Sequence, residues 1–287
     1  MPFVVFAWIA SFFYGLVVIV SKLTTKHAIK NPWMFEFFWE LFTLLFLLPI
    51  ALFSGVGFPQ NWGTILIAGF TYAVSGTMYV LALYRLDASV IGPMYTFRTP
   101  MSVLLGVFIA KEFLTAEQLV LICIITIAGI FVSFDERMRL RSFFQPNIGF
   151  ALLAVFAAAV MGLAVNRALG ANGYWEATLW ISIVGQVFLL GLIPLFIKDF
   201  RTTKPAAYSG IAISSMVFVI GLLAFNRAIA ENISITTAIL SLPLSLIIIF
   251  ILSRVAPQLL EKHTAQVYMI RLIAALVMVG AALRLSL

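Results

Sequence analysis

The chain of 287 residues is 63% hydrophobic and 10% charged, with a mean hydropathy of +1.11 and a formal charge of +7. Soluble domains carry about 45–50% apolar and about 25% charged residues, so a water-soluble fold is excluded and an integral membrane protein is predicted. The basic residues are scattered among short connections and form no stripe, which argues against a nucleic-acid partner. Cys123 is the single cysteine, so the chain has no disulfide framework.

Apolar runs long enough to cross a membrane follow one another along the chain. A spanning helix needs about 20 mostly apolar residues, and the runs lack the two-residue alternation of strands. Because Met1-Pro2 leads into apolar sequence without a basic region, we expect the first run to be retained rather than cleaved as a signal peptide. The ten predicted spans are 3–21, 34–53, 62–84, 89–110, 117–134, 147–168, 175–197, 206–226, 234–253 and 265–284.

Four short sequence matches recur in the same order in the two halves of the chain. They pair YGL at 14–16 with MGL at 161–163, ALYR at 82–85 with AFNR at 224–227, PMSV at 100–103 with PLSL at 243–246, and EFLTA at 112–116 with EKHTA at 261–265. Five spans in each half would bring the second half in from the opposite side of the membrane. The matches therefore predict an inverted repeat of residues 1–141 and 142–287.

The segment from Ala82 to Gln118, ALYRLDASVIGP followed by TPMSVLLGVFIAKEFLTAEQ, resembles the drug/metabolite transporter superfamily of EamA type. The resemblance rests on small residues at span ends, a mid-helix proline and the glutamate that opens the last hairpin of the half. The resemblance implies ten helices, a central cavity between the two halves, and alternating-access transport of a small metabolite. The second half departs from the pattern by six extra residues near Ala256-Pro257-Gln258, and Trp39 and Glu40 stand where such proteins often carry an arginine.

The basic residues also predict an orientation. Twelve of the eighteen Lys and Arg residues fall in the connections after spans 1, 3, 5, 7 and 9, four fall on the other side, and Arg98 and Arg271 lie within spans. The positive-inside rule then puts the termini outside the cytoplasm, whereas the family resemblance implies cytoplasmic termini. The charges favour the first alternative.

Arg98 is the most unusual residue of the predicted spans, because it lies near the bilayer midplane in the span 89–110. A charge at that depth costs at least about 2.5–3.5 kcal/mol, so a function is expected. Arg98 either contacts an anionic substrate in the central cavity or pairs with a buried carboxylate such as Glu40. The repeat aligns Ser241 with Arg98, and this asymmetry favours a role in substrate selection.

Further polar and aromatic residues complete the predicted site. Arg98 and Ser241 are joined in the predicted substrate-binding set by Tyr14, Tyr79, Tyr95, Thr99, Asn166 and Thr237. The predicted hinges are Pro93, Pro100 and Pro243, because a proline inside a helix removes a backbone hydrogen bond. Glu40 is the best candidate for ion coupling or for an ion pair with Arg98 or Arg271. Glu36, nearer the membrane interface, is either a second such group or a snorkelling anchor.

The function that best fits these features is secondary transport of a small organic metabolite, an amino acid or organic anion, with export favoured by the family resemblance. A flippase for lipids or lipid-linked sugars is the alternative. No catalytic motif, metal set or cofactor motif occurs, so an enzyme is not expected. The expected partners are the substrate, membrane lipids and a coupling H⁺ or Na⁺. We expect a monomer or homodimer. Its expected location is a cell membrane of the prokaryotic inner-membrane type, which it crosses several times.

Overall fold

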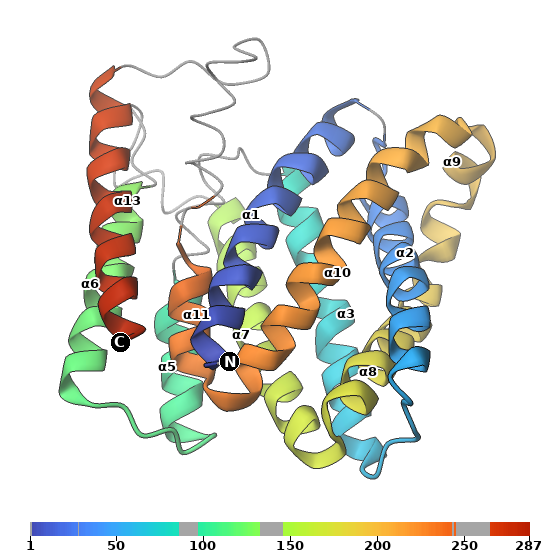
Figure 1. Cartoon of the computed structure of the whole chain (residues 1–287). Coiled ribbons are helices and arrows are strands. Elements are labelled where there is room, and N and C mark those ends of the chain that lie inside the picture. The colour runs from blue at the N-terminus through green and yellow to red at the C-terminus, as the bar shows by residue number, and fades with distance from the viewer. Residues whose placement is uncertain (1, 28, 86–96, 133–145, 243, 245–264) are drawn as a thin grey trace.

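The computed structural model describes residues 2–27, 29–85, 97–132, 146–242, 244 and 265–287, which form helices and connections without a strand (Figure 1). In chain order the α-helices are α1 (Phe3–His27), α2 (Pro32–Phe53), α3 (Trp62–Arg85), α5 (Arg98–Phe108), α6 (Ala116–Val132), α7 (Pro146–Asn172), α8 (Tyr174–Leu189), α9 (Ile197–Thr202), α10 (Tyr208–Glu231), α11 (Ile233–Leu240) and α13 (Ala265–Leu285). Short 3₁₀ helices cover η2 (Leu190–Leu195) and η3 (Pro205–Ala207).

Six stretches of the described residues are long and apolar enough to cross a membrane. They are Phe3–Thr25, Pro32–Phe53, Trp62–Arg85, Leu152–Asn172, Tyr174–Leu195 and Pro205–Glu231. The apolar helix segment Ala116–Phe131 is shorter. Each stretch overlaps a span predicted from hydropathy, which confirms a multi-pass helical membrane protein.

The ends of the helices follow from local sequence. The side chain of Asn31 caps α2 by accepting hydrogen bonds from the backbone N–H groups of Trp33 at 2.9 Å and Met34 at 3.2 Å, and Pro32 follows it at the first helical position. Gly173, with φ of 91°, makes the left-handed turn between α7 and α8. These signals place the turns between consecutive membrane-crossing helices.

Two of the differences between the described helices and the predicted spans involve prolines. The α-helix predicted over 175–197 ends at Leu189 and continues as the 3₁₀ helix η2, which contains Pro194, a residue that cannot donate the backbone hydrogen bond of an α-helix. In the span predicted over 89–110, α5 begins only at Arg98, while residues 89–96 lie outside the described part of the chain. Pro100 therefore lies in the first turn of α5, where a missing N–H leaves no intrahelical bond unmade.

Helices from the two halves of the sequence pack against each other in a repeating pattern. α1 packs on α10 as α7 packs on α3, and α2 packs on α10 as α8 packs on α3. Likewise, α1 packs on α11 as α7 packs on α5. Three further pairs each join one helix of the first half to one of the second: α5 with α11, α6 with α13, and α2 with α8. An approximate twofold relation between the halves predicts this pattern.

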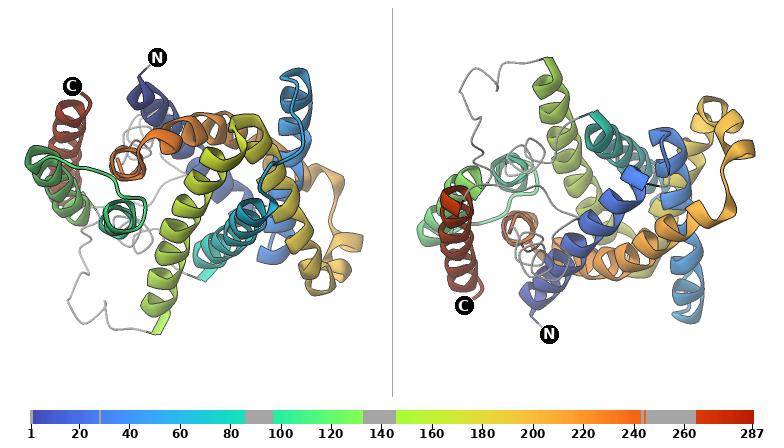
Figure 2. Two further views of the ribbon diagram at one scale, coloured as in Figure 1. Left: turned by 90° about the horizontal axis from the view of Figure 1, so that it is seen from below. Right: turned by 90° about the horizontal axis from the view of Figure 1, so that it is seen from above.

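Both termini lie at one end of the bundle, together with the connection between α2 and α3 (Figure 1). The connections from α1 to α2 and from α8 to α10 lie at the other end, in agreement with the predicted alternation of the basic connections. Seen along the bundle, α6 and α13 form a pair at one side, and α2 lies at the opposite side with η2 and α9 (Figure 2). Large apolar side chains on the outer faces remain exposed to the surroundings, among them Leu119, Ile127, Leu272 and Leu276.

Candidate functional site

Arg98 begins α5 and reaches toward helices of the second half. Its guanidinium carbon lies 5.7 Å from the centroid of the Phe225 ring of α10, within the range of a cation–π contact. A Cβ atom added to Gly162 of α7 would lie 3.9 Å from Nη2 of Arg98, an ordinary contact distance, so the guanidinium lies close to α7. The half-buried arginine thus lies where α5, α7 and α10 meet.

Aromatic rings extend from Phe225 through the centre of the bundle. Tyr14 of α1 is tilted against Phe225 at 6.0 Å between centroids and stacked on Phe218 at 5.4 Å. Phe218 in turn contacts Trp39 of α2 at 5.1 Å. A Cβ atom at Gly221, between the two phenylalanines on α10, would lie 2.7 Å from atoms of the Tyr14 ring. Gly221 is therefore required for this close approach.

Two buried carboxylates lie one helical turn apart on α2. Glu40 is 5% exposed and accepts a hydrogen bond of 2.8 Å from the hydroxyl of Tyr72 on α3. Glu36 is 1% exposed, and neither of its carboxylate oxygens has a hydrogen-bond partner among the described residues. The Glu36 carboxylate packs against Gly76, where an added Cβ atom would overlap Oε1.

These positions revise two expectations about the carboxylates. Glu36 is buried too deeply for a snorkelling anchor, because α3 covers the face of α2 on which it lies. Within the described part of the chain, Glu40 has a tyrosine hydroxyl as its partner and forms no ion pair with Arg98 or Arg271. Arg271 lies on α13, which packs on α6 and α11.

α5 and α11, the described parts of the predicted spans 4 and 9, meet through two threonines of the predicted site. The Thr99 hydroxyl donates to the carbonyl oxygen of Thr237 at 3.4 Å, and both residues are buried. The hydroxyl of Thr237 donates to the carbonyls of Ile233 at 2.7 Å and Ser234 at 3.1 Å. Ser241 follows α11 and donates to the carbonyl of Ala238 at 2.7 Å. In this conformation the three hydroxyls bond to backbone carbonyls.

The other predicted site residues are less central or lie outside the described residues. Asn166 of α7 donates to the carbonyls of Ile229 at 2.7 Å and Ala230 at 3.3 Å, at the end of α10. Tyr79 of α3 lies 6.1 Å from Trp39 between ring centroids, on the side of the buried carboxylates. Tyr95, Pro93 and Pro243 fall among the residues that the structure does not describe, so their roles stay predictions.

Phe218 and Phe225 were missed by sequence reasoning, although they connect Arg98 to the rest of the site. Their spacing of seven residues puts them on one face of α10, with Gly221 between them. In a chain with 27 phenylalanines this spacing carries little information. Tyr72 is not among the predicted site residues, and only the structure gives it a carboxylate partner.

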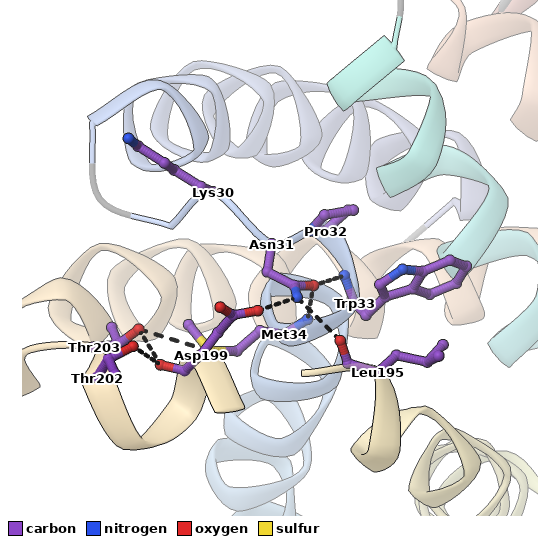
Figure 3. A pocket seen from close by; sticks show the side chains of 9 residues that line it. All are labelled: Lys30, Asn31, Pro32, Trp33, Met34, Leu195, Asp199, Thr202 and Thr203. Carbon is purple, nitrogen blue, oxygen red and sulfur yellow. Dashed lines mark hydrogen bonds between the residues drawn. The ribbon is translucent and has the colours of Figure 1, made fainter. Parts of the chain in front are cut away.

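A pocket of about 590 Å³ lies away from this centre, between the start of α2 and the segment η2–α9 (Figure 3). Lys30, Trp33 and Thr202 contribute to its lining. Its polar groups largely bond to one another: Nδ2 of Asn31 donates to Oδ2 of Asp199 at 2.5 Å and to the carbonyl of Leu195 at 3.2 Å. The pocket contains none of the predicted site residues.

The fold and the buried charges at its centre define a polytopic helical membrane protein whose central groups come from both halves of the sequence. Residues 1–134 match the EamA-like transporter family, in agreement with the resemblance seen in the sequence. This match points to a non-enzymatic membrane transporter.

A solved structure titled "Crystal structure of protein" shares the fold, with a TM-score of 0.74 and 13% sequence identity over 98% of this chain and 95% of that chain. The comparison with curated proteins gives no match.

Proposed function

We propose that this protein is a secondary active transporter that exports a small organic metabolite, an amino acid or another organic anion, across a cell membrane. In this proposal, two inverted five-helix halves rock about a central site and expose it to each side in turn. The repeating pattern of helix contacts and the family of residues 1–134 support the proposal. The proposed direction of transport, export from the cell, rests on the family resemblance alone.

The observation that carries the proposal is the half-buried guanidinium of Arg98, which lies on the ring of Phe225 where helices of both halves meet. A planar guanidinium binds a carboxylate through two parallel hydrogen bonds. The neighbouring rings of Tyr14 and Phe218 offer an apolar surface for the rest of an organic anion. Arg98 would then select the substrate, and Thr99, Thr237 and Ser241 would lie beside it.

The first experiment is a thermal-shift screen of the purified protein against amino acids and organic anions, since a ligand that binds the folded state raises the melting temperature. For a ligand so identified, Arg98→Ala should weaken binding roughly 10- to 100-fold, as expected when a charge-assisted contact is lost. Arg284→Ala is the matched control, because Arg284 is an exposed arginine paired with Glu117 at 2.8 Å. Equal affinity in wild type and Arg98→Ala would refute the assignment. Movement of fluorescent lipid without uptake of any soluble anion would favour the flippase.

Glu36 and Glu40 are the proposed coupling groups. Two carboxylates on adjacent turns of one helix repel each other strongly in a low dielectric, and a bound H⁺ or Na⁺ relieves this repulsion. Neither carboxylate has an ion pair with a described residue, and Tyr72 donates to Glu40 alone.

Transport by proteoliposomes, driven by a proton gradient without Na⁺ or by a Na⁺ gradient at equal pH, identifies the ion. Glu40→Gln and Glu36→Gln should each abolish gradient-driven accumulation while leaving ligand exchange, whereas Glu117→Gln, at an exposed site, should change neither. Gradient-driven accumulation by the double variant would disprove the coupling role.

A further inference from the structure

The connection between α5 and α6 carries a carboxylate from the first half of the chain into the second. Glu112 accepts hydrogen bonds from the backbone N–H groups of Ile233 and Ser234, the latter at 3.1 Å, and from the hydroxyl of Ser234. These two residues open α11. Asn232 completes the cap by accepting from the N–H of Ile235 at 2.7 Å. The first turn of α11 thus depends on a side chain more than a hundred residues away.

The connection is shaped to deliver this carboxylate. Lys111 has a φ of 60°, a left-handed conformation that non-glycine residues seldom adopt, and the N–H of Glu112 donates to the carbonyl of Gly106 at 3.0 Å. Gly106 of α5 lies directly under the contact, since a Cβ atom there would lie 2.6 Å from Oγ of Ser234 and would overlap Glu112. Only glycine lets α5, Glu112 and Ser234 meet at this point.

The contact is linked to the proposed substrate site through one turn of helix. The carbonyls of Ile233 and Ser234 accept the hydroxyl of Thr237, whose own carbonyl accepts from Thr99, the neighbour of Arg98. Glu112 therefore fixes the turn of α11 that lies against α5. The α5–α6 and α10–α11 connections both lie at the end of the bundle where the termini lie (Figure 1).

We propose that Glu112 is a latch that holds this end of the transporter closed. The inference rests on the alternating access of the proposed function: opening this end requires α5 and α11 to separate there, and the bonds from Glu112 to α11 must then break. Removing them should shift the population toward the conformation open at the end of the termini. Glu112 acts through α11 and is a positioning residue.

The test uses thiol accessibility and needs no substrate. Cys123→Ser removes the single native cysteine. Ser102→Cys then supplies a reporter on the buried face of α5, one turn after Arg98. In a separate variant, Leu287→Cys marks the side of the termini, because Leu287 is 98% exposed in the wild type. A membrane-impermeant maleimide is added to either side of oriented vesicles, and the ratio of reporter labelling from the two sides is measured.

Glu112→Gln and Glu112→Ala should raise labelling of the reporter from the side of the termini roughly 5- to 30-fold relative to the other side, the effect of losing a charged helix cap. Glu117→Gln, five residues further on, is the matched control and should leave the ratio unchanged. Ser234→Ala removes the hydroxyl contact alone, should give a smaller shift in the same direction, and serves if the Glu112 variants fail to fold.

An unchanged labelling ratio in folded Glu112 variants, even with a lower melting temperature, would overturn the latch and leave Glu112 as a structural cap. The same result in Ser234→Ala would count against it equally. A shifted ratio in a protein that binds and moves no organic anion would support the latch and refute the proposed substrate. The two failures are therefore distinguishable.

Discussion

The crossing of α3 and α8 permits a sharp test of the packing that supports the central carboxylates. A Cβ atom at Gly69 would lie 2.5 Å from Cγ1 and 2.7 Å from Cβ of Val184, and 3.2 Å from the backbone nitrogen of Gly185. Ordinary contacts between carbon atoms are about 3.5–4.0 Å, so Gly69→Ala creates an overlap of roughly 1 Å. Because backbone atoms are involved, the helices must move apart.

Such overpacking typically costs about 1–3 kcal/mol of folding free energy. The matched control is Gly170→Ala on α7, where an added Cβ atom has no neighbour within 4 Å. Alanine at that site should be neutral or stabilise the helix by up to about 1 kcal/mol. The melting temperature of Gly69→Ala in detergent, followed by tryptophan fluorescence, should therefore fall below those of the wild type and of Gly170→Ala.

The same crossing bears on the site, because Gly185 packs against the ring of Tyr72, 2.9 Å from where its Cβ atom would lie. Tyr72 is the hydrogen-bond donor to Glu40. Gly185→Ala should accordingly lower the melting temperature and also impair ion-driven transport. If Gly69→Ala melts no lower than Gly170→Ala, the close approach of α3 and α8 does not exist and the reasoning fails.

Two further predictions concern hydrogen bonds. Tyr72→Phe leaves the buried Glu40 without its donor, which should cost about 1–3 kcal/mol and alter the dependence of transport on the driving ion gradient. Tyr84→Phe removes a bond of 2.7 Å to the carbonyl of Ile29, and it should lower the melting temperature without changing the ion dependence of transport. An identical ion dependence in both variants would contradict the special role of Tyr72. Asn166→Ala removes two bonds to the end of α10 and should cost about 1–2 kcal/mol in thermal unfolding. The thermal shift caused by a ligand should survive in Asn166→Ala, and its loss would instead support the substrate contact predicted from the sequence.

Candidate residues could be read from the sequence, but most of their partners could not. Arg98 and Glu40 stood out because charges inside apolar runs are costly wherever the helix lies. An ion pair of Glu40 with Arg98 or Arg271 was one of the alternatives, and among the described residues Glu40 bonds to Tyr72 instead. Depth in the membrane says nothing about which helix faces which. Glu112 belongs to a sequence match between the halves, but only the structure shows that it caps α11.

The sequence by itself determined that the chain crosses a membrane several times and, for six crossings, the approximate position of each. Those properties follow from hydropathy, turn residues and the count of spans, all of which act locally. Only the tertiary structure decided that Gly69 meets Gly185, that Phe225 carries the guanidinium of Arg98, and that Glu36 is buried against Gly76. In a membrane helix the lipid-facing and protein-facing sides are both apolar, so hydropathy cannot tell them apart. Close packing of small residues on neighbouring helices selects the buried face, and that choice appears only when the helices are assembled.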